Sequence, residues 1–126
     1  MNDPTHPILD PPWRWEIDSF TWHSKQHFSP CALDVRFVRD GVCRTLRFIE
    51  PTDVTIQFSD GSPIQCGDLI ILDIRGRQLA GLEVQVTEFG ASGTPLRLYA
   101  KTVQEIESEQ RVTNNPMDRS GGSAAT

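Results

Sequence analysis

The stretch that decides the fold is ALDVRFVRDGVCRTLRFI, residues 32–49. On both sides of Asp40-Gly41, apolar residues alternate with polar ones. This two-residue period is typical of a β-strand, in which successive side chains point to opposite faces. Asp-Gly between two such runs favours a type I′ turn, because both residues can adopt positive φ. The sequence therefore predicts a β-hairpin with strands over 32–39 and 42–49. Its inward-facing residues are expected to be Leu33, Val35, Phe37, Leu46 and Phe48.

Further strand-like segments follow the hairpin and precede it at intervals of about ten residues. They are expected over 13–17, 53–58, 69–74, 82–89 and 96–100, with 103–107 continuing the last one. Residues 18–30 are mixed in character and are expected to form a loop. No amphipathic helix separates the segments, so the fold class is mainly β. We expect an antiparallel sandwich, roll or open barrel of about seven strands.

The chain divides into three parts. Residues 1–12 contain four prolines, which fix φ and remove N–H donors, and we expect an extended arm in which His6 is solvated. Residues 13–107 form a single β domain. Residues 108–126 are polar and rich in Ser, Gly and Asn, and we expect a flexible, disordered tail because so little apolar surface can be buried there.

Composition and charge narrow the function classes. The net charge is −5 over 126 residues, with no basic stripe to neutralise phosphates, which argues against nucleic-acid binding. The first residues lack the apolar core of a signal peptide, and no apolar run approaches the roughly 20 residues needed to cross a bilayer. Cys31, Cys43 and Cys66 are too widely spaced for a disulfide framework or a metal knuckle. We expect a cytoplasmic protein with free thiols, no membrane contact and no cofactor.

No catalytic residue can be assigned. Phosphate-binding loops, zinc-protease helices and nucleophile elbows are absent from the sequence. Asp73 is the acid in the most apolar stretch, and a buried carboxylate needs a partner. Arg75 or Arg77 would supply it as an ion pair; the alternative is a perturbed acid in a cleft.

His23 and His27 are the candidates for metal ligation. On a helix, histidines four residues apart share one face and can hold zinc, with Asp18 as a third ligand if the loop folds favourably. The segment from Trp22 to Phe28 has no helical stripe and no nearby cysteine. Two imidazoles in a surface loop are therefore the competing interpretation.

Two groups of residues are candidates for a binding surface. Trp13, Trp15 and Trp22 crowd the first quarter of the chain, and aromatic side chains contribute much of the energy at protein interfaces. The alternative is that they plug one end of the barrel. Arg75, Arg77 and Gln78, in a turn, form the second candidate patch.

Three stretches resemble the C-terminal half of small uncharacterised bacterial β-domains, some of which are grouped with immunity proteins of polymorphic toxin systems. The stretches are LRFIEPTDVTI (46–56), GDLIILDIRGRQLAGLEVQVTEF (67–89) and LRLYAKTVQEIE (96–107). The likeness covers about half of the chain and rests on strand rhythm; the first half departs from it, and no functional residue is carried over. It implies a non-catalytic protein that binds another protein.

The leading hypothesis is thus a non-catalytic protein-binding domain, of which an immunity-type protein that binds a toxin is one form. The alternative is a small β-barrel enzyme or ligand-binding protein with its site in the barrel mouth. A third hypothesis is self-association through edge strands. A deep pocket lined by Asp73, an arginine and a tryptophan would favour the alternative, whereas a filled interior with an apolar surface patch would favour protein binding.

Overall fold

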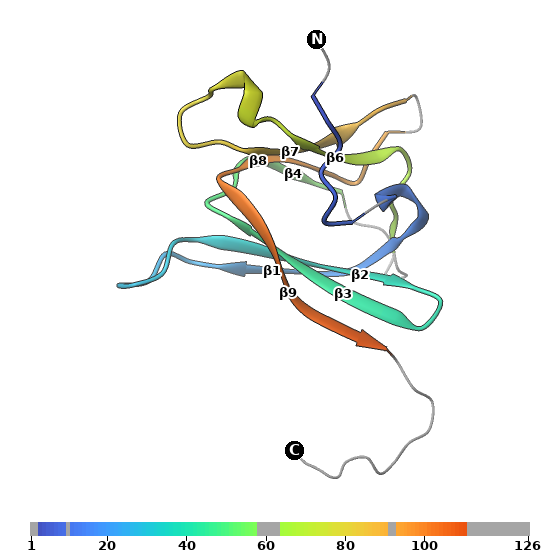
Figure 1. Ribbon diagram of the computed structural model, residues 1–126. Coiled ribbons are helices and arrows are strands. Elements are labelled where there is room, and N and C mark those ends of the chain that lie inside the picture. Colours follow the sequence, from blue (N-terminus) through green and yellow to red (C-terminus); the bar gives the residue numbers. More distant parts are fainter. Residues whose placement is uncertain (1–2, 10, 58–63, 91–92, 111–126) are drawn as a thin grey trace.

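The computed structural model describes residues 3–9, 11–57, 64–90 and 93–110, the last four of these by their backbone. Two antiparallel sheets face each other (Figure 1), and the prediction of a mainly β fold is confirmed. One sheet has the strand order β5-β1-β2-β3-β9 and the other the order β4-β8-β7-β6. The strands are β1 Glu16–His23, β2 Ala32–Arg39, β3 Val42–Ile49, β4 Thr52–Ile56, β5 Ile64–Gln65, β6 Leu69–Asp73, β7 Val84–Glu88, β8 Leu96–Ala100 and β9 Thr102–Gln110.

The β2–β3 hairpin has the predicted bounds and the predicted turn. Asp40 and Gly41 have φ values of 50° and 79°, as a type I′ turn requires. The two-residue turn pairs Leu33 with Phe48 and Val35 with Leu46, so that large apolar side chains meet on the inner face.

The first strand differs from the prediction. Residues Pro12–Arg14 form a short 3-10 turn (η1), and β1 begins at Glu16 and runs to His23 through most of the expected loop. The register shifts between Ile17 and Ser19, which is a β-bulge. Ile17 therefore faces the core opposite Phe37, and the inward positions resume three residues later at Phe20. Because the bulge interrupts the two-residue period, the alternation of apolar and polar residues does not reveal the full length of this strand.

The chain passes from one sheet to the other at two corners, which lie together at one end of the sandwich. The first corner is Glu50-Pro51, between β3 and β4, and the second is Lys101, between β8 and β9. The Lys101 N–H donates to the Ile49 carbonyl at 2.9 Å, and the Glu50 N–H donates to the Cys31 carbonyl at 2.9 Å. These bonds tie the second corner to the end of β3 and the first corner to the residue that precedes β2.

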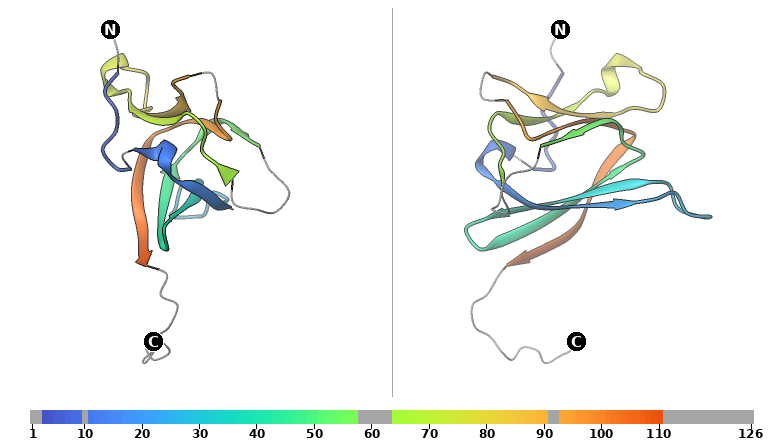
Figure 2. Two further views of the ribbon diagram at one scale, coloured as in Figure 1. Left: turned by 90° about the vertical axis from the view of Figure 1, so that its right-hand side faces the viewer. Right: turned by 180° about the vertical axis from the view of Figure 1, so that it is seen from behind.

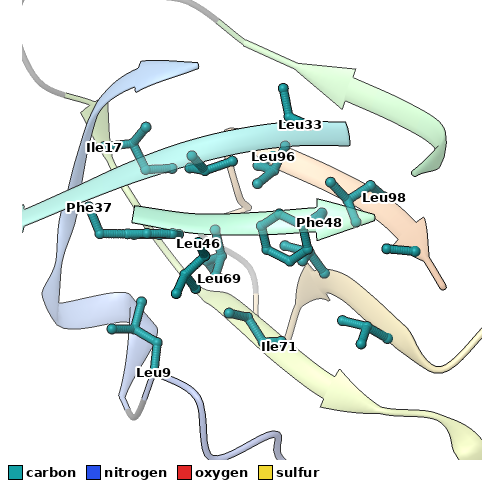
Figure 3. Packing of buried hydrophobic residues seen from close by; sticks show 14 of the residues in the cluster. Leu9, Ile17, Leu33, Phe37, Leu46, Phe48, Leu69, Ile71, Leu96 and Leu98 are labelled. Atoms are coloured by element: carbon teal, nitrogen blue, oxygen red, sulfur yellow. The ribbon is translucent and has the colours of Figure 1, made fainter. Parts of the chain in front are cut away.

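The interior is filled by one apolar cluster contributed by both sheets (Figure 3). Phe37 and Phe48 have no exposed surface, nor do Leu46, Leu69 and Ile71. Each such side chain stabilises the fold by about 1.5–3 kcal/mol relative to an exposed one. Both sheets thus contribute side chains to this cluster, which occupies the space between them in the described part of the chain.

The N-terminal arm packs on the sandwich (Figure 2); Thr5 forms a β-bridge with Leu72, and residues 7–9 form a turn, so the arm is not extended throughout. The His6 N–H donates to the Ile71 carbonyl and the Asp73 N–H donates to the Pro4 carbonyl, both at 2.8 Å, so the arm covers the edge of β6. Leu9 is fully buried in the core. His6 is half-buried, not solvated, and burial lowers its pKa.

At the other end of the domain, β9 continues to Gln110 and thus includes the first residues of the expected tail. The strand is longer than predicted because its whole length pairs with β3. The rest of that tail, residues 111–126, lies outside the described residues.

Candidate functional site

The connection between β1 and β2, residues 24–31, extends beyond the end of its sheet (Figures 1 and 2), and we call it the finger loop. Its tip is closed by two backbone hydrogen bonds, from the Gln26 N–H to the Ser29 carbonyl at 2.8 Å and from the Ser29 N–H to the Gln26 carbonyl at 3.3 Å. The two residues between them are His27 and Phe28. Their rings pack edge to face with centroids 4.3 Å apart. The finger loop thus has a locally defined conformation at its tip.

Phe28 is 90% exposed, the largest exposed fraction among the large apolar side chains of the described chain. Trp22, at the base of the finger loop near the end of β1, is 53% exposed. Water-exposed aromatic rings on a protruding element are typical of interface anchors, because their burial against a partner is favourable.

A buried polar cluster supports the base of the finger loop. Asp34 of β2 is only 8% exposed and lies between His23 of β1 and Arg47 of β3. The Arg47 Nε and Nη2 atoms donate to Asp34 Oδ1 and Oδ2 at 2.7 and 2.9 Å, and His23 Nε2 lies 2.8 Å from Oδ2. This two-pronged geometry is the strongest form of an Arg–carboxylate pair.

The electrostatics of the cluster favour the charged form of Asp34. Burial by itself raises the pKa of this carboxyl, but the hydrogen bonds from Arg47 and His23 outweigh burial and hold the pKa below its ordinary value. The same hydrogen bonds raise the pKa of Arg47. The pair is therefore ionised across the physiological range. It joins β2 to β3, and the His23 contact adds β1, so the cluster links both strands that flank the finger loop to β3.

Two hollows flank the finger loop. One, of about 510 Å³, lies over the polar cluster and is lined by Trp22, His23, Arg47 and Gln104 together with residues of the loop. The other, of about 540 Å³, lies at the end of the sandwich where the chain changes sheets. Its lining residues include Lys25, Cys31, Glu50 and Lys101. Pro30 contributes to both hollows.

The structure separates the three tryptophans that the sequence grouped together. Trp15 packs against the core, with the Arg44 guanidinium 5.9 Å from its ring centroid. Trp13 lies before the start of β1, is 41% exposed, and packs edge to face on Phe89 at 5.0 Å. Trp22 lies near the far end of the same strand. Only Trp22 lies beside the finger loop, so the three tryptophans do not form one surface.

The Arg75–Gln78 turn is a weaker candidate surface because its cations already have protein partners. Arg75 pairs with Asp73 at 2.6 Å, as predicted, and Arg77 pairs with Asp3 of the arm at 2.6 Å. Hydrogen bonds from Arg75 lower the pKa of Asp73 to about 2. Gln78 ends the short 3-10 turn η2 (Arg75–Arg77) in a left-handed conformation.

The hollow beside Asp73 is small, about 220 Å³. Its described lining contains His6, Arg75 and Glu83 but no tryptophan. The deep Asp73 pocket that would favour a ligand-binding function is therefore not found in the described part of the chain.

The predicted metal ligands are not brought together. His23 is held by Asp34, and His27 packs on Phe28 at the tip of the finger loop. The interpretation of both imidazoles as loop groups is wrong for His23, which is the last residue of β1. Over residues 3–9, 11–57, 64–90 and 93–110, no group of three potential metal ligands occurs. In that same part of the chain, no helix is long and apolar enough to cross a bilayer.

The three cysteines are unpaired, as expected, and differ in exposure. Cys31 is partly exposed, whereas Cys43 and Cys66 are buried. Burial raises the pKa of the Cys66 thiol to about 12, so this group is protonated at neutral pH.

The polar cluster was not among the sites predicted from the sequence, although a signal for it was present. Once the two-residue turn is accepted, the register of the hairpin pairs Asp34 with Arg47 directly. The contribution of His23 depends on the bulge in β1, which no sequence pattern indicated. Comparison of the chain with models of protein families, with curated proteins and with solved structures finds no match.

Proposed function

We propose that this protein is a non-catalytic domain that binds another protein, and that the finger loop is its contact surface. The observation that carries the proposal is the 90% exposure of Phe28 at the tip of a loop closed by its own backbone hydrogen bonds. Burial of an exposed phenylalanine in a partner's pocket is worth about 1.5–3 kcal/mol. A loop that is already ordered loses less conformational entropy on binding than a flexible one.

The surroundings of Phe28 support the same conclusion. Trp22 adds a second exposed aromatic ring at the base of the loop, and the ion pair of Asp34 with Arg47 holds the strands beneath it. Residues 19–33 contain Lys25 and two histidines but no acidic residue, in a chain with a net charge of −5. The finger loop and the strand ends that flank it thus form a locally cationic element with an aromatic tip, which suits an apolar pocket with an acidic rim.

The filled interior argues against a ligand held inside the barrel (Figure 3). Self-association through the edge strands β4, β6 and β9 is also disfavoured. The arm covers β6, and β4 has a bulge at Asp53, whose φ is 52°. The β9 segment TVQEIESEQ carries three glutamates and no base, so two copies of β9 would bring like charges together.

Among protein partners, a toxin is the candidate implied by the resemblance of residues 46–56, 67–89 and 96–107 to immunity-type β-domains. The cytoplasm is the expected compartment. A partner with an acidic pocket and a function that must be blocked inside the producing cell would satisfy both expectations.

The experiment introduces a photo-crosslinking phenylalanine analogue at position 28, in cells that naturally express the protein. We expect a covalent adduct with one protein partner. With that partner purified, Phe28→Ala should weaken binding at least 30-fold, which corresponds to about 2 kcal/mol. The matched control is Phe89→Ala, because Phe89 is an exposed aromatic residue (54%) outside the finger loop.

Two outcomes would overturn the proposal. The first is the absence of any protein adduct at position 28 in cells that express the full chain. The second is a partner that binds the Phe28→Ala and Phe89→Ala variants equally well. Phe28 contributes little to the fold because it is exposed, so a loss of binding cannot be attributed to unfolding.

A further inference from the structure

We infer that the hollow at the end of the sandwich binds a small organic anion, a carboxylate on an apolar body, and that Lys25 and Lys101 hold its charge. The inference is separate from the protein-binding function, because it concerns the 540 Å³ hollow and not the tip of the finger loop. Its volume lies in the range of known small-molecule sites, about 300–1,000 Å³.

The chain contains only two lysines, and both line this hollow. They are far apart in the sequence. The finger loop contributes Lys25, and the corner between β8 and β9 contributes Lys101. The hydrogen bond from the Lys101 N–H to the Ile49 carbonyl fixes that corner beside the first one, at Glu50. The two cations are thus brought to one place by the sheet-crossing topology.

These lysines differ from most of the arginines in having no carboxylate partner among the described residues. Neither lysine has a carboxylate within 4 Å in the described part of the chain. Seven arginines do have such a carboxylate: Arg36, Arg39, Arg44, Arg47, Arg75, Arg77 and Arg97. Glu50 is the one acid among the described residues that line the hollow, so two lysines and one glutamate give this lining a formal charge of +1. A cationic hollow on a chain of net charge −5 selects an anionic ligand.

The remaining walls indicate that the ligand has an apolar part. They include Pro30, Pro51, Ala80 and Leu82. Proline has no N–H to donate, so these walls offer a ligand apolar contact more than hydrogen bonds. The lysine ammonium groups are flexible point charges, which suit a carboxylate without demanding a fixed geometry.

The backbone of the hollow is held in a fixed and unusual form. Glu50 has a φ of 50°, which is uncommon for a residue with a long side chain. The hydrogen bond from its N–H to the Cys31 carbonyl, together with the buried Pro51, maintains this conformation. Strained positions of this kind persist only where the surrounding structure determines them, and they are common at ligand sites.

The test uses octanoate as the probe, with octanol and inorganic phosphate as comparison ligands. Binding is measured from amide shifts in two-dimensional NMR spectra of the full chain. We expect saturable shifts at Cys31, Gly81 and Lys101 with octanoate and none with octanol. Lys25→Met and Lys101→Met should each weaken octanoate binding about tenfold, equivalent to one charge contact. The matched control is Arg14→Gln, which removes an exposed cation outside the hollow that likewise has no carboxylate partner among the described residues.

Several outcomes would overturn the inference. If Arg14→Gln weakened octanoate binding as much as the lysine substitutions do, net charge alone would explain the binding. If octanol bound as tightly as octanoate, apolar contact alone would explain it. Phosphate binding as tightly as octanoate would show that the apolar walls play no part, and the absence of saturable shifts would show that there is no site. Octanoate binding should survive Phe28→Ala, so this inference and the proposed protein contact can fail independently.

Discussion

Replacement of Asp34 by Asn should destabilise the fold by about 2 kcal/mol, and the magnitude follows from the structure. The Asp34 side chain, taken without its backbone, is only 11% exposed; its carboxylate accepts two hydrogen bonds from Arg47, and His23 Nε2 lies 2.8 Å away. Hydrogen bonds to charged groups contribute about 1.5–3 kcal/mol each when they are well desolvated. The Arg47 side chain is 32% exposed, so solvent screening reduces the contribution. We therefore assign about 2 kcal/mol to the whole set of contacts.

The assay is urea denaturation at pH 7 together with a thermal melt. A loss of 2 kcal/mol should lower the melting temperature by about 10 °C in a domain of this size. Asp40→Asn is the matched control, since the Asp40 side chain is 87% exposed and its ion pair with Arg39 spans 3.5 Å. Its effect should be below about 0.5 kcal/mol.

The pH dependence provides a second measure of the same contact. The pKa of Asp34 is lowered in the folded state, so its stabilising contribution is complete above the unfolded pKa of about 4. The contribution is lost as the pH falls through the folded pKa. The difference in free energy of unfolding between the native chain and Asp34→Asn should therefore have its largest value at pH 7. It should shrink in acid, where the side chain at position 34 is uncharged in both proteins.

Two results would refute this reasoning. One is a loss of stability at pH 7 no larger than that of Asp40→Asn. The other is a stability difference that does not change with acidification. Arg47→Met combined with Asp34→Asn should be more stable than the sum of the single effects, because the double variant leaves no unpaired charge under the finger loop.

Three further predictions concern the core, the thiols and the arm. Phe48→Ala should lower the free energy of unfolding by about 3–5 kcal/mol in urea titrations, since the ring is fully buried; a loss below 1 kcal/mol would contradict the packing. Cys31 should react readily with a thiol reagent in the native protein, whereas Cys66, buried and with a pKa of about 12, should react only on unfolding; equal rates would be inconsistent with this burial. The Asp73 carboxyl should titrate by NMR with a pKa of about 2, so its contribution to stability is present above pH 4 and is lost below it; Arg75→Gln should move that pKa back toward its ordinary value, and an unchanged pKa would show that Arg75 is not the cause.

The candidate site could be predicted only in part. The ion pair of Asp73 with Arg75 followed correctly from burial and proximity in sequence. Trp22 is exposed beside the finger loop, whereas Trp13 and Trp15 lie elsewhere on the fold, so the three do not form one surface. The binding role of these residues stays a prediction. Proximity in sequence does not imply proximity on a strand's surface, because a β-strand of eight residues separates its ends by about 25 Å.

By itself, the sequence determined the mainly β class and the hairpin over 32–49. Both depend on local rules, the alternation of side chains on a strand and the positive φ values at Asp40-Gly41. The tertiary structure alone decided which distant residues meet. A bulge after Ile17 placed His23 on the same face as Asp34, diagonally across from it, and the fold brought Lys25 of the finger loop and Lys101 of a sheet-crossing corner to one hollow. Such contacts join segments far apart in the chain, and their geometry depends on packing between sheets, which no local pattern of residues encodes.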